Sequence, residues 1–236
     1  CYKKENFNKT MNTTTCYIIC SAPRSGSHLL SYLLTDTQLA GFPQEYFNPW
    51  FMGDAHNEFP DKLVYEKSHI TKLIEKYTSP NGVFGIKAQF DQAADFVGLN
   101  RLESFFPSPL KYIFIQRNDK TRQAVSLARA EQTDQWMSGQ AQQREPQYNY
   151  FQIRSCLREI KLQEKGWETY FMERDIQPYR VNYEELVANP EPVILGALAY
   201  LGIELPADFQ VPAPRIQKQA DHLSEDWVTR FARDEN

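Results

Sequence analysis

The sequence predicts an α/β fold of three layers, in which a central, mainly parallel sheet carries helices on both faces. Three observations predict it. Apolar runs of strand length alternate with stretches of helical periodicity along the chain. Two of these runs lead into a polar loop and then into a helix. The 236 residues are 42% hydrophobic, enough for the core of one domain, which we expect over residues 15–236 after a tail of residues 1–14.

The first strand-like run covers residues 16–21, and Pro23 ends it because proline cannot continue a central ladder. A short polar loop follows, and the apolar spacing of residues 29–34 is helical. This strand, loop and helix N-terminus form a P-loop-like arrangement. Free backbone N–H groups and the helix dipole favour an anion there.

The residues of this loop add to that preference. Gly26 lets the backbone approach a ligand closely, and Arg24 supplies a fixed positive fork. Ser25, Ser27 and His28 supply further side-chain donors. The alternative is an ordinary turn with a serine cap. The loop is not a Walker A sequence, because no Lys-Ser or Lys-Thr follows its glycine, and this argues against a nucleotide triphosphatase.

The remaining elements follow in chain order. We expect a helix closing over 35–40 before Gly41, an ordered aromatic loop over 42–51, a helix over 61–77, a strand over 83–90, a helix over 91–106, a strand over 110–116, a helix over 123–130, a lid-like loop over 138–150, a helix over 151–175, a strand over 179–183 and a helix over 189–201 ended by Gly202.

Composition excludes several classes of protein. The formal net charge is −4, whereas nucleic-acid binders usually carry a basic footprint. Cys16 and Cys20 lie four apart on one strand, roughly 13 Å from each other, which is too far for a disulfide. We expect a reduced, cytoplasmic setting. No cysteine or histidine spacing indicates a metal site, and no apolar run approaches the roughly 20 residues of a membrane span.

Three residues beyond the first loop are candidates for catalysis or anion binding. Glu45 has aromatic neighbours, which tend to raise a carboxyl pKa and suit a general base; the alternative is a helix cap or a surface ion pair. Lys87 comes near the end of the second strand, facing the ligand crevice or snorkelling at a sheet edge. Arg117 ends the third strand, where it either holds a second anion together with Ser126 or pairs with Asp119.

Three stretches resemble the sulfotransferases, most closely the bacterial trehalose 2-sulfotransferase family. They are Pro23-Arg24-Ser25-Gly26-Ser27, Pro43-Gln44-Glu45-Tyr46-Phe47, and residues 117–127 with Gln132, Thr133 and Trp136 beyond. Residues 182–186 and 218–227 are weaker matches. The stretches occur in order and follow the expected strand ends, and together with the weaker matches they cover nearly the whole chain.

The resemblance implies the donor 3′-phosphoadenosine 5′-phosphosulfate (PAPS) and no metal. Arg24 and the amides of residues 25–28 would then hold the 5′-phosphosulfate, while Arg117 and Ser126 would hold the 3′-phosphate. Tyr183 matches a tyrosine that contacts adenine. A basic segment that closes over the 3′-phosphate in the wider superfamily corresponds to Arg215, Lys218 and Gln219.

The resemblance also implies the reaction. An acceptor hydroxyl attacks sulfur in line, with Glu45 as the general base and Arg24 and Lys87 as catalytic partners. The acceptor is a carbohydrate or glycolipid, most simply a trehalose-like sugar, contacted by Gln44, Tyr46, Gln132 and Trp136. His28 departs from the threonine of the relatives, and we expect it to bind the sulfonate. Relatives form dimers, so a homodimer is expected. The alternatives are a P-loop-like kinase and a module that binds the product, PAP, without catalysis.

Overall fold

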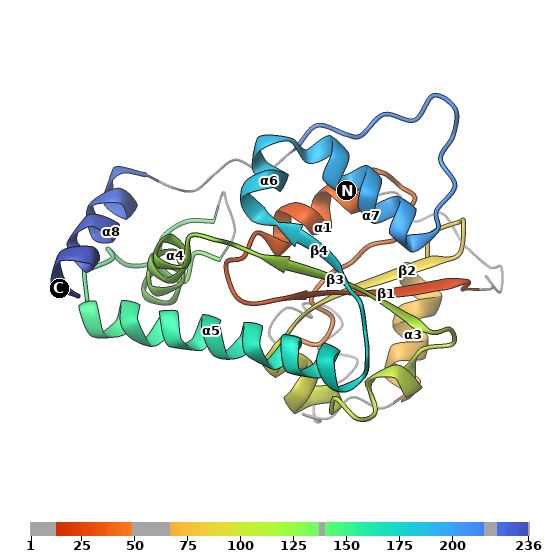
Figure 1. Ribbon diagram of the computed structural model, residues 1–236, viewed down its shortest axis with the longest axis horizontal. Helices are drawn as coiled ribbons and strands as arrows, with labels where there is room; N and C mark the ends of the chain where they lie inside the picture. The colour runs from red at the N-terminus through yellow and green to blue at the C-terminus, as the bar shows by residue number, and fades with distance from the viewer. Residues whose placement is uncertain (1–12, 49–66, 137–139, 215–220, 236) are drawn as a thin grey trace.

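A four-stranded parallel sheet forms the centre of the computed structural model, which describes residues 13–48, 67–136, 140–214 and 221–235. The strands are β1 (Thr15–Ser21), β2 (Val83–Gln89), β3 (Leu110–Gln116) and β4 (Tyr179–Asn182), in the order β2-β1-β3-β4. Helices cover both faces of this sheet (Figure 1), which confirms the predicted three-layer α/β fold. Because all strands are parallel, their carboxyl ends share one edge of the sheet.

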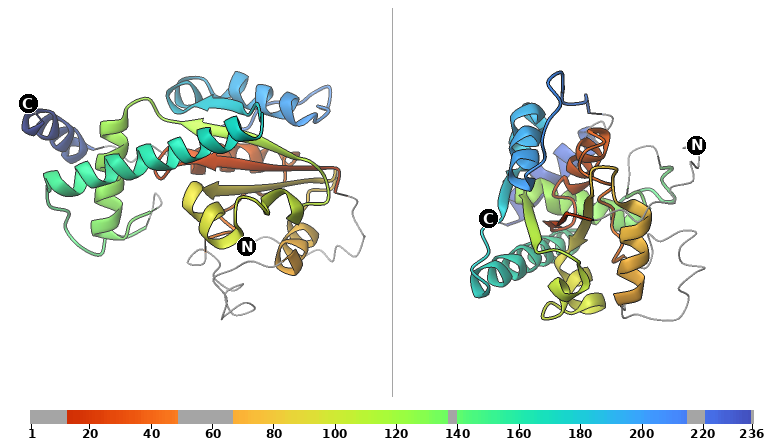
Figure 2. Two further views of the ribbon diagram at one scale, coloured as in Figure 1. Left: turned by 60° about the horizontal axis from the view of Figure 1, so that its bottom comes forward. Right: turned by 90° about the vertical axis from the view of Figure 1, so that its right-hand side faces the viewer.

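One face of the sheet packs against α1 (Ser27–Asp36), α6 (Tyr183–Ala188) and α7 (Pro190–Leu201). Alternate β1 residues point to this side, so Tyr17 and Ile19 are fully buried under leucines of α1 and α7. Both side views in Figure 2 show this helical layer on one side of the strands.

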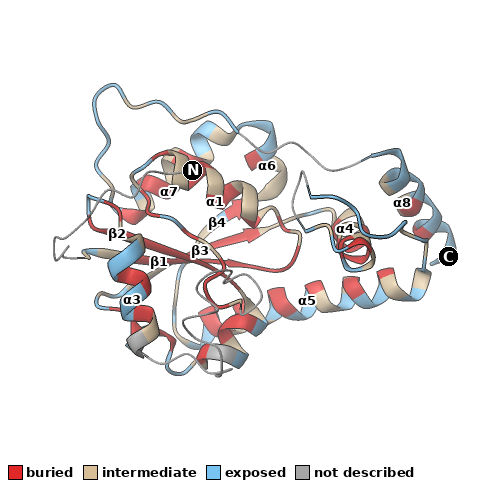
Figure 3. Cartoon of the chain, turned by 180° about the vertical axis from the view of Figure 1, so that it is seen from behind, coloured by how far each residue is buried: buried red, intermediate tan, exposed pale blue. Residues whose placement is uncertain are grey.

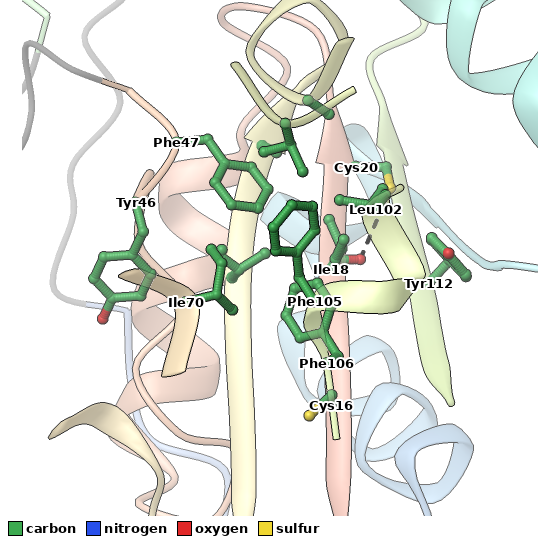
Figure 4. Close-up of a cluster of buried hydrophobic side chains, with 14 of the residues drawn as sticks. Cys16, Ile18, Cys20, Tyr46, Phe47, Ile70, Leu102, Phe105, Phe106 and Tyr112 are labelled. Atoms are coloured by element: carbon green, nitrogen blue, oxygen red, sulfur yellow. Dashed lines mark hydrogen bonds between the residues drawn. The ribbon is translucent and has the colours of Figure 1, made fainter. Parts of the chain in front are cut away.

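The opposite face carries α3 (Lys67–Tyr77), two short turns called η1 (Gln92–Val97) and η2 (Leu102–Phe105), and α5 (Tyr150–Glu173). Its core is rich in aromatic side chains, and Figure 4 shows Phe105 and Phe106 gathered around β1. Tyr46 and Phe47 belong to the same cluster, so the loop around Glu45 is fixed by packing.

A third cluster lies beyond the carboxyl end of the sheet, where α4 (Lys120–Thr133), the N-terminal part of α5 and α8 (His222–Asp234) pack together. The buried rings of Trp227 and Phe231 hold α8 in this cluster. Figures 1 and 3 show α8 against α4 at the far end of α5, away from the strands.

Three predicted elements are corrected. The helix over 91–106 is instead the π-helical turn η1 and the 3₁₀ turn η2, because Gly98 adopts a φ of 82° and interrupts a continuous helix. The first helix ends at Asp36, since Gln38 takes a left-handed conformation with φ 59°. The strand predicted over 179–183 ends at Asn182, whose side chain caps α6 by accepting a hydrogen bond from the Glu185 N–H.

The predicted end of the helix over 189–201 is confirmed. Gly202 ends α7 with a φ of 74°, as expected for a left-handed C-terminal residue. Cys16, Cys20 and Cys156 are buried free thiols. Among the described helices, none combines the length and apolar character needed to cross a membrane, and the described side chains include no metal-binding cluster of histidine, cysteine and carboxylate groups.

Candidate active site

The loop between β1 and α1 follows the carboxyl end of the central strand and has an unusual backbone. Arg24 and Gly26 both have positive φ angles, 58° and 94°. A Cβ atom on Gly26 would lie 2.2 Å from Cδ2 of Tyr183, so only glycine fits here. The close approach that Gly26 permits in this structure is therefore to the Tyr183 ring.

Two buried side chains hold the loop from behind. The Trp167 Nε1–H donates to the Ser21 carbonyl at 3.2 Å, and the Gln123 amide donates to the Pro23 carbonyl at 2.7 Å. The sequence predicted both residues only as parts of the helices over 151–175 and 123–130, so neither contact with the loop was foreseen. Gln123 is fully buried, and a buried glutamine needs a hydrogen-bond partner. Its burial could not be read from a single sequence, so the contact had no signal there.

Polar atoms around the loop are buried without a partner. Ser25 Oγ, His28 Nε2 and Arg117 Nε have no hydrogen-bond partner among the residues that the structure describes. Leaving such groups unpaired costs about 1–3 kcal/mol each. Three of them beside the N-terminus of α1 therefore form an environment suited to an anion.

Arg24 lies between this loop and α4. Its Nε donates to Ser126 Oγ at 2.9 Å, and its Nη1 donates to the Trp136 carbonyl at 2.6 Å. Burial, and after it the positive charge of Arg117, lowers the pKa of Arg24. The two arginines thus act on each other at one site. Ser126, expected beside Arg117, is a partner of Arg24 in this structure.

Arg117 comes from the end of β3 and stacks on Tyr183, with its guanidinium carbon 4.8 Å from the ring centroid. The backbone that follows is fixed by the Glu184 carboxylate, which accepts from the Asn118 N–H at 3.0 Å and the Asp119 N–H at 3.2 Å. The alternative pair of Arg117 with Asp119 is not formed, because Asp119 pairs with Arg122 at 2.7 Å.

Glu45 is placed beside Lys87 by backbone pairing. Gln44 forms a parallel bridge with Ile86, and the Lys87 N–H donates to the Gln44 carbonyl at 2.9 Å. Ser31 of α1 donates to the Pro43 carbonyl and holds the segment from the other side. The Lys87 ammonium then lies 2.8 Å from Glu45 Oε1, and both side chains are less than a tenth exposed.

The ion pair overturns two expectations. Burial by itself raises the pKa of Glu45, but the charge and hydrogen bond of Lys87, helped by Asn48, lower it to about 2. The expected rise beside aromatic rings is therefore wrong, because a buried cation outweighs them. Lys87 is not a snorkelling edge residue either, since its side chain is only 1% exposed.

His28, the second residue of α1, faces the same groups. Burial and the charge of Lys87 lower the pKa of His28 to about 4, while Glu45 opposes and Arg24 adds to this effect. The imidazole is therefore neutral at neutral pH. The structure thus brings Arg24, His28, Glu45 and Lys87 into one electrostatically coupled group at the carboxyl edge of the sheet.

The residues expected to contact the acceptor are more scattered. Tyr46 packs on Tyr77 with ring centroids 4.9 Å apart and donates its hydroxyl to the Phe42 carbonyl, so it is a core residue. The Gln132 amide donates to the Gln147 carbonyl, which ties α4 to the segment preceding α5. The exposed Trp136 ring donates to Asp134.

One further contact concerns Gln44, whose amide lies 3.5 Å from Ser31 Oγ. The basic segment with Arg215, Lys218 and Gln219 lies outside the described residues.

The fold and the site define an α/β protein with a loop of buried polar atoms that lack partners among the described residues, and with a buried carboxylate–ammonium pair, at one edge of a parallel sheet. The Stf0 sulphotransferase family matches residues 16–234, nearly the whole chain. The chain therefore belongs to the Stf0 sulphotransferase family, as the three sequence stretches predicted.

Two curated relatives match over most of the chain, and solved structures show a similar fold. The chain is 29% identical to the trehalose 2-sulfotransferase of Mycolicibacterium smegmatis, over 93% of this chain and 95% of the relative. It is 28% identical to the trehalose 2-sulfotransferase of Mycobacterium tuberculosis, over 91% and 93%. The fold is similar to a sulfotransferase from Alicyclobacillus acidocaldarius, with a TM-score of 0.53, 17% identity and coverage of 92% and 91%. A sulfotransferase domain from the curacin biosynthetic pathway gives a TM-score of 0.50, 14% identity and coverage of 94% and 97%.

Proposed function

We propose that this sulfotransferase moves the sulfonate group of PAPS to a hydroxyl group of a carbohydrate or glycolipid, with a trehalose-like sugar as the preferred acceptor. The observation that carries the donor assignment is the set of buried, unpartnered polar atoms beside the N-terminus of α1. The acceptor class rests on the two curated relatives, both named as trehalose 2-sulfotransferases and both matching over most of their length.

The donor site divides into two ends. The 5′-phosphosulfate lies at the loop, where Ser25 Oγ, His28 Nε2 and the amides at the start of α1 supply its partners. The 3′-phosphate is bound by Arg117, whose Nε is unpartnered among the described residues. Arg24 lies between the two ends, because it donates to Ser126 and the positive charge of Arg117 lowers its pKa. Tyr183, packed between Gly26 and Arg117, borders the adenosine.

The reaction follows from the charges that develop. The acceptor oxygen forms a bond to sulfur while the bond from sulfur to the bridging phosphate oxygen breaks, and PAP leaves with that electron pair. Arg24 and Lys87 stabilise the negative charge on the departing oxygen. The hydroxyl proton passes to the Glu45 carboxylate, which is ionised at neutral pH in the free protein, where its pKa is about 2.

The remaining residues position these groups. Gln92 of η1 and Asn48 donate to Glu45 Oε2 at 3.2 Å and 3.0 Å and fix the plane of the carboxylate. Acceptor selection falls to Gln44, to Gln132 and Trp136 near the end of α4, and to the loop that follows them. The buried free thiols fit a reducing compartment, and we place the protein in the cytoplasm on that basis.

The experiment that tests the proposal supplies labelled PAPS and a panel of sugars and glycolipids to the full chain. Transfer of the label to a hydroxyl-bearing acceptor, with trehalose among the best, supports it. Binding of PAP with no label on any acceptor, either in the panel or in a metabolite extract, would indicate a binding module and contradict the proposed activity.

A further inference from the structure

The two oxygens of the Glu45 carboxylate have different partners. Oε2 accepts from the Asn48 amide at 3.0 Å and from the Gln92 amide at 3.2 Å. Oε1 pairs with the Lys87 ammonium at 2.8 Å. The neutral amides hold the side chain in place, while the ammonium at Oε1 blocks the oxygen that would take a proton and makes it a weak base.

The Lys87 ammonium is in turn poorly satisfied. It is fully buried on β2, and apart from the ion pair Nζ has no hydrogen-bond partner within the described chain. Three donors sit on an ammonium group, so two of them are unused. The charges that act on Lys87 are Glu45 and Arg24, and Lys87 in turn acts on His28, so its charge is close enough to influence two residues at the loop between β1 and α1.

We propose that Lys87 is shared between two anions in turn: in the free protein it neutralises Glu45 Oε1, and in the donor complex it moves to the sulfonate of PAPS and releases Oε1 to act as the base. This inference rests on the proposed function. A sulfonate placed at the loop offers the unused N–H groups of Lys87 oxygen acceptors that the protein itself does not supply.

The exchange has a chemical consequence for Glu45. Without an ammonium at Oε1, burial is the dominant influence left on the carboxyl group, and burial raises its pKa. The base thus becomes strong only while a donor is bound. In the transfer step Oε1 takes the proton of the acceptor hydroxyl as the oxygen–sulfur bond forms and the bond from sulfur to the phosphate oxygen breaks. Lys87, held at the sulfonate, stabilises the negative charge that develops there and on the adjacent departing oxygen.

Infrared difference spectroscopy on the full chain tests the exchange, because the carbonyl stretch of a protonated carboxyl group reports the state of Glu45. The protein is titrated through the acid range alone, with PAP and with PAPS, in the absence of acceptor. With PAPS the Glu45 band should appear about 2 pH units higher than with PAP, which lacks the sulfonate. Glu45→Gln assigns the band by removing it, and Glu45→Asp assigns it by shifting it.

Lys87→Met is the matched variant, because it removes the ammonium and keeps an apolar side chain of similar length. In this variant the band should appear at the raised pH without any ligand, and PAPS should add no further shift. If this variant fails to fold, the comparison of PAPS with PAP on the wild type still tests the exchange of Lys87.

The outcomes separate this inference from the proposed function. If PAP and PAPS both bind but the Glu45 band titrates at the same pH with either ligand, the exchange of Lys87 is overturned while the donor assignment survives. If neither ligand binds in calorimetry, the proposed function itself fails.

Discussion

Glu45 shows what a single residue can and cannot reveal from sequence. Its position in Pro43-Gln44-Glu45-Tyr46-Phe47 indicated a role in catalysis, but the direction of its pKa was predicted wrongly. The reason is Lys87, which is 42 positions away in the chain (87 minus 45) and reaches Glu45 only because Gln44 pairs with β2. A long-range contact of this kind has no signature in local composition.

The first prediction concerns this carboxylate as a base. Glu45→Gln keeps the shape of the side chain but removes the proton acceptor, so the rate of sulfate transfer should fall by about 10²–10⁴-fold. PAP affinity should stay near the wild-type value, because the proposed donor site consists of the loop and Arg117 and does not include Glu45. Rates with labelled PAPS and calorimetry with PAP measure the two quantities. Near-normal turnover would remove Glu45 from the role of base.

The second prediction concerns acid stability. The pKa of Glu45 is lower in the folded protein, about 2, than its ordinary value of 4.5. The unfolded chain therefore binds more protons in this range, and the contribution of Glu45 is complete above pH 4.5 and lost as the pH falls toward 2. Thermal unfolding should show this loss, and the double variant Glu45→Gln with Lys87→Met should show a smaller dependence over the same range. Equal slopes would contradict the role assigned to the pair.

At the scale of elements, the loop between β1 and α1 depends on α4 and α5 behind it. Gln123 and Trp167 each hold a carbonyl of the chain that leaves β1. The strands and the loop were predictable because their patterns are local. The hydrogen bonds from Gln123 and Trp167 were not predictable, because they join distant segments; 146 positions separate Ser21 from Trp167. A similar long-range contact precedes η1, where the Gln163 side chain accepts from the backbone N–H groups of Phe90 and Asp91.

The third prediction tests the support from α5. Trp167→Phe keeps a buried ring but loses the N–H group that donates to the Ser21 carbonyl. The free energy of unfolding should therefore fall by about 1 kcal/mol, and PAP affinity should fall as well. Tyr170→Phe on the same helix is the matched control, because it loses a hydroxyl hydrogen bond to Tyr112 of β3 rather than a hydrogen bond to the loop. Denaturant unfolding and PAP calorimetry are the measurements. An equal loss of PAP affinity in both variants would count against a loop-specific role for Trp167.

At the scale of the whole molecule, the chain places its last helix far from the strands, on α4 and α5. The link consists of buried Trp227 and Phe231 together with ion pairs of Arg129 with Asp221 and Arg122 with Glu225. The three-layer architecture was predictable from the alternation of strands and helices. The strand order and this docking were not, because they depend on contacts between distant segments.

The fourth prediction concerns the docking of α8. Asp221 caps this helix by accepting from the Ser224 N–H and also pairs with Arg129. Asp221→Ala should destabilise the protein by about 1 kcal/mol and speed hydrogen exchange in α8. Asp226→Ala, on the exposed surface of the same helix, should change stability by less than about 0.5 kcal/mol. Similar exchange rates in both variants would show that the cap and ion pair do not hold α8.

The central claim is that the loop after β1 and Arg117 bind one adenosine nucleotide between them. Calorimetry with PAP, in the absence of magnesium, on the wild type and on Arg117→Ala tests this claim most directly. We expect PAP to bind the wild type at a single site and Arg117→Ala to bind it roughly 10–100-fold more weakly, as the loss of a charged hydrogen bond implies. No binding of PAP, together with binding of Mg-ATP, would contradict the account and indicate a kinase-like site instead.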